Sequence, residues 1–337
     1  MNDIILKRDY KESRWSIFSW APTSLVNGYK AEKKLLETEI QFDDKTSVGY
    51  VELDKNKRIN TLTLTAHPSN QKNLVMTHGY GAGLGFYYKN YNELKKMDGF
   101  NVYAIDWLGM ANSSRPSFVK SHYRDTEDKV VSDAEDFFVD SLEEWRKKMG
   151  LDQMVLLGHS LDLSTCYALK YPSRVEKLIL VSPVGVPVEP PPAEQQIRPG
   201  FLMRFFRTLW SWNITPMSVI RTLGPAGPSL VRKYTSRRFA HLADEENKAL
   251  EDYIYHISAQ SGSGEYALAR LLKPGAWAKK PLYHRVHDLK MPTSFIYGDQ
   301  DWMDHRHALN TVGNFKSPVK VAVVANAGHH LYLGNYC

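Results

Sequence analysis

The pattern of apolar and polar residues changes character twice along this chain of 337 residues. After a polar start, alternating and β-branched segments at 48–53 and 60–66 predict two antiparallel strands joined by a charged turn. From residue 73, short continuous apolar runs alternate with segments of helical periodicity. Such runs are typical of strands that are buried on both faces of a parallel sheet. The pattern therefore predicts an α/β fold, with a mostly parallel central sheet and helices on both faces.

The alternating part predicts strands over 73–77, 101–106, 154–158, 177–182, 293–297 and 319–324. A helix is predicted over 130–149, because apolar residues recur there every three to four positions. Its apolar stripe consists of Ala134, Phe138, Leu142, Trp145 and Met149. We expect this stripe to pack against the sheet.

The alternation stops at Pro187–Pro192, and from there to about Asp288 the chain is helical, aromatic and basic. We interpret this part as a helical cap inserted into the sheet domain. The expected organisation is a 1–38 aromatic and helical segment, a 39–186 first part of the core, a 187–288 cap and a 289–337 second part of the core. The apolar segment 201–212 of the cap either packs on the cap itself or forms a lid that contacts acyl chains or a bilayer.

Aromatic residues near the start of the chain leave a similar choice open. Trp15, Phe18 and Trp20 lie within six positions of one another. They are suited either to contact with a membrane interface or to packing against the main domain.

Composition narrows the class of protein. Hydrophobic residues make up 43% and charged residues 24%, which suits a folded core. The net charge of +6 fits ordinary solubility, or attraction to anionic lipid surfaces and phosphate-bearing substrates. The basic residues form no dense run, which argues against nucleic acid as a partner. Two cysteines, Cys166 and Cys337, give neither a disulfide framework nor a metal-binding spacing, so we expect a reducing compartment and no metal.

Targeting signals are scarce in the sequence. We identify neither a secretory signal nor an uninterrupted apolar run of about 18 residues, so a role at a membrane would be exercised from its surface. Lys7 and Arg8 leave a mitochondrial location open, and Asp3 and Asp9 argue against it.

The candidate chemistry centres on Ser160, which lies between a predicted strand and a predicted helix. The segment reads Gly158-His-Ser160-Leu-Asp162 and resembles the nucleophile elbow G-x-S-x-G, with Asp162 in place of the second glycine. A serine hydroxyl needs a base to accept its proton and a carboxylate to orient that base. Ser160, Asp301 and His329 each follow a predicted strand, in the order of nucleophile, acid and base of α/β-hydrolases.

Several alternatives remain at this point. His330 is the reserve base, and Asp304 is the alternative acid. Acyl transfer also needs backbone N–H groups to bind the oxyanion. We expect one from Leu161, directly after the nucleophile, and one from Tyr80 or Gly81 in the glycine-rich loop.

Motifs spread over most of the chain resemble a known group of enzymes. They are Trp20–Ser24, Thr77–Ala82, Asp106–Gly109, Ser113–Pro116, Leu156–Ser160, Leu223–Pro225, Gly227–Pro228, Tyr253–His256, Tyr297–Met303 and Gly328–His330. On these residues the chain resembles the α/β-hydrolase-domain lipid enzymes. That group includes N-acyl-phosphatidylethanolamine lipases, lysophosphatidic acid acyltransferases and cardiolipin deacylases, and a lipase co-activator of lipid droplets is related to it.

The resemblance implies a serine hydrolase that cleaves acyl esters of phospholipids or lysophospholipids. It also implies a cytoplasmic protein peripheral to membranes or lipid droplets. No cofactor is implied, although acyl-CoA would be a co-substrate if the chain is a lysophosphatidic acid acyltransferase. The basic residues Arg232, Lys233, Arg237 and Arg238 would then either face the lipid phosphate or form a solvated surface.

The sequence departs from the group at three places. Asp162 replaces a glycine and the helix after the elbow is two residues shorter, so we expect weakened catalysis. Gly334 replaces the aspartate of the group's H-x4-D motif, which weakens the acyltransferase hypothesis. The chain ends at Cys337, where the group continues into a final helix, so we expect exposed apolar surface. The alternative hypothesis is a catalytically impaired relative that binds lipid surfaces or another lipase.

Overall fold

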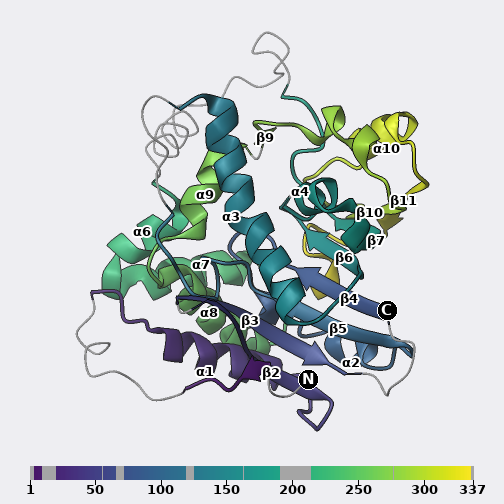
Figure 1. Cartoon of the computed structure of the whole chain (residues 1–337). Helices are drawn as coiled ribbons and strands as arrows, with labels where there is room; N and C mark the ends of the chain where they lie inside the picture. The colour runs from purple at the N-terminus through teal and green to yellow at the C-terminus, as the bar shows by residue number, and fades with distance from the viewer. Residues whose placement is uncertain are drawn as a thin grey trace.

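The computed structural model describes residues 4–9, 20–54, 56–65, 72–118, 125–161, 163–189, 214–275 and 277–334 (Figure 1). Several features singled out in the sequence lie outside these residues. They are Asp3, the aromatic residues Trp15 and Phe18, Asp162 of the elbow, residues 190–192 of the proline segment, the apolar segment 201–212 and Cys337.

Within the described residues, nine strands form one sheet in the order β1-β2-β3-β5-β4-β6-β7-β10-β11. Their bounds are β1 Ile5–Leu6, β2 Thr46–Asp54, β3 Lys57–Leu64, β4 Lys72–Thr77, β5 Phe100–Ile105, β6 Met154–His159, β7 Val175–Val181, β10 Thr293–Gly298 and β11 Val319–Val324. The pairs from β1 to β5 are antiparallel, and every pair from β5 to β11 is parallel. The predicted α/β fold with a mostly parallel sheet is therefore confirmed.

Helices connect the parallel strands and form the segment between β7 and β10. The α-helices are α1 Leu25–Leu36, α2 Tyr91–Leu94, α3 Glu127–Lys148, α4 Leu163–Lys170, α6 Pro216–Thr222, α7 Gly227–Arg238, α8 Asp244–Ala259, α9 Gly264–Leu271 and α10 Arg306–Thr311. The short 3₁₀ helices are η2 Leu84–Tyr87, η3 Pro172–Arg174, η4 Gly224–Ala226, η5 Leu282–His284, η6 Val286–Asp288, η7 Val312–Asn314 and η8 Leu331–Leu333. A small hairpin pairs β8 Leu272–Lys273 with β9 Trp277–Ala278.

The core lies in two apolar clusters. One joins sheet residues to α3 and α4, and the other joins sheet residues to α1 and α8. Neighbouring residues of one strand go to opposite clusters, as Leu74 and Val75 do, because successive side chains of a strand point to opposite faces. All five residues of the stripe predicted for α3 are buried. The amphipathic pattern of that helix therefore positions it against the sheet.

The cap helices α6 to α9 follow one another between β7 and β10, and α8 lies beside α1 (Figure 1). The indole of Trp20 donates a hydrogen bond to the carbonyl of Thr222 at 3.0 Å, and its ring lies against Gly224. Trp20 is nevertheless 68% exposed, so it contacts the cap and the solvent together. The expected domain boundaries stay a prediction.

A buried polar network fixes the start of the described chain to the core. Arg8, considered above with regard to a mitochondrial location, binds Glu32 and Asn60 and stacks on Tyr29 at 4.5 Å. Asp106 accepts hydrogen bonds from Asn60 at 2.7 Å and from the N–H of Leu84 at 2.6 Å. Burial, and then the charge of Glu32, raise the pKa of Asp106 above its ordinary value. The network therefore joins α1, the sheet and the end of the glycine-rich loop.

None of the described helices is both long enough and apolar enough to cross a bilayer.

We predict that Phe138→Ala lowers the free energy of unfolding by about 3–5 kcal/mol, because it removes a fully buried ring and leaves a cavity. The ring packs edge-on against Trp107 and Phe137. Urea unfolding measures the change. The control is Phe42→Ala, since Phe42 is 40% exposed and should change stability by less than about 0.5 kcal/mol. Equal losses in the two variants would contradict the assignment of this core.

Candidate active site

Ser160 lies at a sharp turn between β6 and α4. Its φ of 60° is in the left-handed region, which is strained for a residue with a side chain. The N–H of Ser160 donates to the carbonyl of Val181 at 2.9 Å, and this bond ties the turn to β7. A Cβ on Gly158 would lie 2.4 Å from the Oγ of Ser164. Glycine at 158 therefore lets α4 pack closely against β6 and hold the turn.

The structure brings Ser160, His329 and Asp301 together from three separate loops. The hydroxyl of Ser160 lies 3.2 Å from Nε2 of His329, and Nδ1 of His329 lies 3.0 Å from Oδ1 of Asp301. These loops follow β6, β11 and β10, whose carboxyl ends meet at one edge of the parallel sheet. The ring of Trp302 lies 5.1 Å from that of His329.

The electrostatics of this group favour an ionised carboxylate. Burial by itself raises the pKa of Asp301, but hydrogen bonds from His329 and from the N–H of Met303 lower it, and the net shift is downward. An ionised Asp301 accepts a hydrogen bond from Nδ1–H of His329, which leaves Nε2 of the neutral ring as the acceptor that faces the serine hydroxyl.

Comparisons with known proteins identify the family. A family model described as the alpha/beta hydrolase fold matches residues 72–216. A probable 1-acylglycerol-3-phosphate O-acyltransferase of Oryza sativa subsp. japonica is 36% identical, over 96% of this chain and 82% of that protein. A (lyso)-N-acylphosphatidylethanolamine lipase of Homo sapiens is 35% identical, over 92% of this chain and 88% of the relative. The chain belongs to the α/β-hydrolase family.

A solved structure supports the fold of this α/β-hydrolase. The carboxylesterase CesB of Bacillus subtilis aligns with a TM-score of 0.61 over 92% of this chain and 93% of its own. At 17% sequence identity this likeness concerns the fold alone. The two relatives above carry the names of an acyltransferase and a lipase, and neither name refers to cardiolipin. Cardiolipin deacylation therefore gains no support from them.

The two segments expected to supply the oxyanion donors of the α/β-hydrolase are the glycine-rich loop and Leu161. The glycine-rich loop packs directly on the nucleophile, since a Cβ on Gly79 would lie 2.8 Å from the Cβ of Ser160. Tyr80 follows in this loop. The N–H of Leu161 donates to the carbonyl of His159 at 2.6 Å. Leu161 can therefore bind an oxyanion only after this contact opens, and the roles of Tyr80 and Leu161 stay predictions.

Asp304 and His330, the alternative acid and base, lie in other surroundings. Asp304 accepts hydrogen bonds from the guanidinium of Arg306 at 2.9 Å and 2.6 Å. The ring of His330 lies 5.5 Å from Phe86 and 5.7 Å from Phe239. Burial above all lowers the pKa of His330 well below its ordinary value. Its Nδ1 has no hydrogen-bond partner among the residues that the structure describes. The hydrogen bonds of Asp301 and His329 therefore favour these two over Asp304 and His330.

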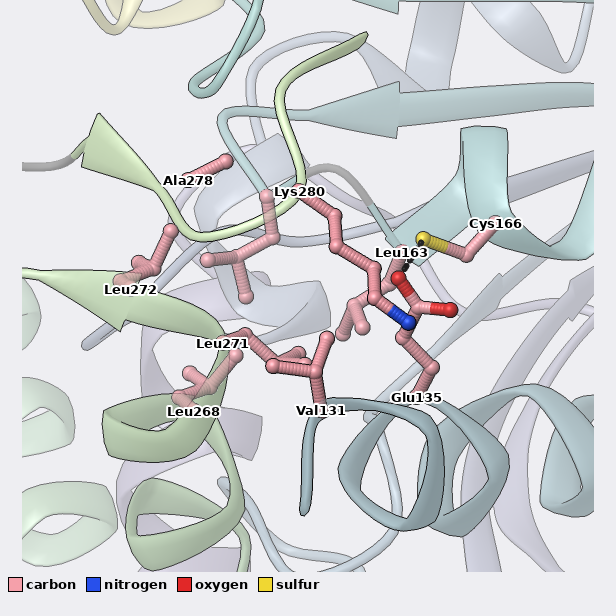
Figure 2. A pocket seen from close by; sticks show the side chains of 10 residues that line it. Val131, Glu135, Leu163, Cys166, Leu268, Leu271, Leu272, Ala278 and Lys280 are labelled. Atoms are coloured by element: carbon pink, nitrogen blue, oxygen red, sulfur yellow. Dashed lines mark hydrogen bonds between the residues drawn. The ribbon is translucent and has the colours of Figure 1, made fainter. Parts of the chain in front are cut away.

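A narrow apolar pocket adjoins the elbow, and nothing in the sequence pointed to it. Its lining comes from α3, α4, α9 and the β8–β9 hairpin (Figure 2). The lining residues are Val131, Glu135, Leu161, Leu163, Cys166, Leu268, Leu271, Leu272, Ala278 and Lys280, and the cavity volume is about 20 Å³. A wider cavity of about 440 Å³ adjoins it through Glu135 and Lys280. Sequence reasoning missed the pocket because these residues have no common spacing.

The four basic residues considered for lipid phosphate lie on α7. Arg232, Lys233, Arg237 and Arg238 are all exposed, and Arg232 pairs with Glu251 at 3.0 Å. The charge of Arg238 contributes, after burial and two neighbouring histidines, to the lowered pKa of His330. The end of α7 therefore lies near the histidine loop, and contact of these residues with phosphate stays a prediction.

We predict that Gly158→Ala disrupts the elbow, because the new methyl group would lie 2.4 Å from a hydroxyl of a buried helix. A loss of about 1–3 kcal/mol in the free energy of unfolding is expected from such overpacking. The matched control is Gly313→Ala, since nothing lies within 4 Å of a Cβ there. Thermal and urea unfolding of both variants test the contrast. A Gly158→Ala variant as stable as Gly313→Ala would contradict the described turn.

We also predict that stability falls as the pH is lowered from 7 towards 5. Burial lowers the pKa of His78 to about 4, and burial together with the charge of His329 lowers that of His159 to about 3, from an ordinary 6.5. Below pH 6.5 the unfolded chain therefore binds protons that the folded chain does not. Each such histidine reduces the free energy of unfolding by up to about 1.4 kcal/mol per pH unit.

Urea unfolding at pH 7.5, 6.5 and 5.5 measures the slope of the unfolding free energy against pH. His159→Gln removes one of the groups and should make the slope shallower. An identical slope in wild type and variant would show that His159 is not buried in its neutral form.

Proposed function

We propose that this α/β-hydrolase is a serine-dependent acyl hydrolase of phospholipids or lysophospholipids. The observation that carries the proposal is the continuous hydrogen-bonded series from Ser160 through His329 to Asp301. The names of the acyltransferase and lipase relatives, both directed at lipids with a phosphate group, support the choice of substrate.

The mechanism follows from the donors and acceptors of this series. His329 accepts the proton of Ser160 at Nε2 while Oγ attacks the acyl carbonyl. Asp301 holds the imidazole in the required tautomer and stabilises its charged form. The tetrahedral intermediate releases the lipid alcohol, which takes the proton back from His329. Water then attacks the acyl-serine by the same route and releases the fatty acid.

The apolar pocket beside Leu161 supports an acyl substrate. Apart from Glu135 and Lys280, its lining consists of aliphatic side chains and Cys166 (Figure 2). A volume of about 20 Å³ holds about one water molecule, so the pocket would have to widen for an acyl chain. The hairpin that carries Ala278 forms one wall, and its displacement would provide the space.

Hydrolysis is favoured over acyl transfer from acyl-CoA. Gly334 occupies the position where the resembling acyltransferases carry an aspartate, while the hydrogen bonds of His329 are intact. Water is therefore the proposed acceptor in the second half of the reaction. The proposed location is the surface of a membrane or lipid droplet.

A second candidate function rests on the elbow itself. Because the N–H of Leu161 is engaged with His159, the structure as it stands offers one oxyanion donor fewer than the mechanism needs. A protein that kept this conformation would bind lipid surfaces, or another lipase, without catalysis.

We predict that a fluorophosphonate probe labels the wild-type protein and does not label Ser160→Ala. Asp301→Asn should retain Ser160 but lower kcat for a lysophospholipid ester by about 10⁴-fold, because the imidazole loses its orientation. The control is Asp304→Asn, since Asp304 pairs with Arg306 and should leave kcat within about twofold. Gel fluorescence and fatty-acid release are the two measurements. Folded wild-type protein that neither reacts with the probe nor releases fatty acid, yet binds liposomes, would favour the second candidate.

A further inference from the structure

The residue directly before the nucleophile is buried and bound on both sides. His159 is 1% exposed and ends β6. Its Nε2 lies 3.0 Å from the main-chain carbonyl oxygen of His329, and its Nδ1 lies 3.1 Å from the hydroxyl of Tyr332. Both ring nitrogens therefore point at the segment that carries the proposed base.

Elementary chemistry fixes the tautomer of this ring. A carbonyl oxygen only accepts hydrogen bonds, so Nε2 must carry the proton and donate it to His329. Nδ1 of a neutral ring is then an acceptor, and the hydroxyl of Tyr332 must donate to it. Burial and the nearby His329 oppose a second proton on His159. The direction of both hydrogen bonds is thus determined.

Packing holds the two partners in place. The ring of Tyr332 stands edge-on to that of His159, with 4.9 Å between centroids, and lies 4.7 Å from the ring of Tyr87. Tyr87 in turn donates to the carbonyl of Thr77 at the end of β4. A Cβ on Gly79 would lie 2.9 Å from Nδ1 of His159, so the glycine-rich loop leaves the ring no free space.

We propose that His159 and Tyr332 are positioning residues, which hold the main chain of His329 against the elbow and so set the distance between Ser160 and its base. The inference rests on the proposed function and deepens it. The side chain of the residue before the nucleophile binds the carbonyl of the base, 170 positions further along the chain. Two contacts therefore hold the base near the elbow. One is the 3.2 Å contact between the side chains of Ser160 and His329, and the other is the tether from the side chain of His159 to the main chain of His329.

Three variants test the tether. Tyr332→Phe removes one hydroxyl and keeps the packed ring, so it should lower kcat about fivefold, the effect of one lost hydrogen bond. His159→Phe removes both hydrogen bonds and should lower kcat about 100-fold through misplacement of the base. His159→Gln can donate from Nε2 to the same carbonyl and should restore most of this loss. KM should change little in all three, because none of these side chains is proposed to touch the substrate.

The matched control is Tyr255→Phe. The hydroxyl of Tyr255 is buried and has no hydrogen-bond partner among the described residues, so its removal should leave kcat unchanged. All rates are expressed per site that reacts with a fluorophosphonate, so that loss of folded protein does not count as loss of catalysis. A wild type that hydrolyses esters, with Tyr332→Phe and His159→Phe within twofold of it, would overturn the proposal.

Nuclear magnetic resonance tests the tether without any catalysis. In protein with ¹⁵N-labelled histidine, the signal that disappears in His159→Gln should have the shifts of an Nε2-protonated neutral ring at pH 7. Its Nδ1 signal should move in Tyr332→Phe, when the donor is lost. An Nδ1-protonated ring would overturn the tether even if esters are hydrolysed. If the expected shifts are observed in a protein that hydrolyses no ester, the tether is confirmed and only the proposed function is contradicted.

Discussion

The hydrogen bond between Ser160 and His329 depends on one constraint, the meeting of parallel strand ends at a single edge of the sheet. Ser160 follows β6 and His329 follows β11, strands separated in the sheet by β7 and β10. No local feature of the chain could hold two side chains 169 positions apart at 3.2 Å. The register of β6, β7, β10 and β11 does so, because each parallel pair fixes where its strands end.

The sheet brings the three loops together, and contacts of individual residues then fix the positions of Ser160 and His329. Glycines at 79 and 158 leave room for the loop and the helix that hold the strained turn at Ser160. Asp301 fixes the ring of His329, and His159 binds its main chain. A methyl group added at either glycine would therefore collide with the elbow, 2.4 Å from Oγ of Ser164 at position 158 and 2.8 Å from Cβ of Ser160 at position 79.

Much of the fold could be read from the sequence, because buried parallel strands and the stripe of α3 have distinct periodicities. The proximity of Ser160, Asp301 and His329 followed from their positions after strands. The engagement of Leu161 with His159 could not be foreseen, since it depends on a turn geometry that no residue pattern encodes. The pocket lined by Val131 and Leu271 was missed for a related reason: its walls come from elements far apart in sequence. Asp162, which stands where the elbow pattern G-x-S-x-G has its second glycine, lies outside the described residues.

The central claim is that His329 activates Ser160, and the rate of phosphonylation of Ser160 tests it most directly. Wild-type protein and His329→Gln would be mixed with a fluorophosphonate at pH 7.5, and the adduct on the peptide that contains Ser160 would be followed by mass spectrometry. The geometry predicts that the variant reacts at least about 10³-fold more slowly, because its serine hydroxyl keeps its proton. Equal rates in the two proteins would show that His329 is not the base.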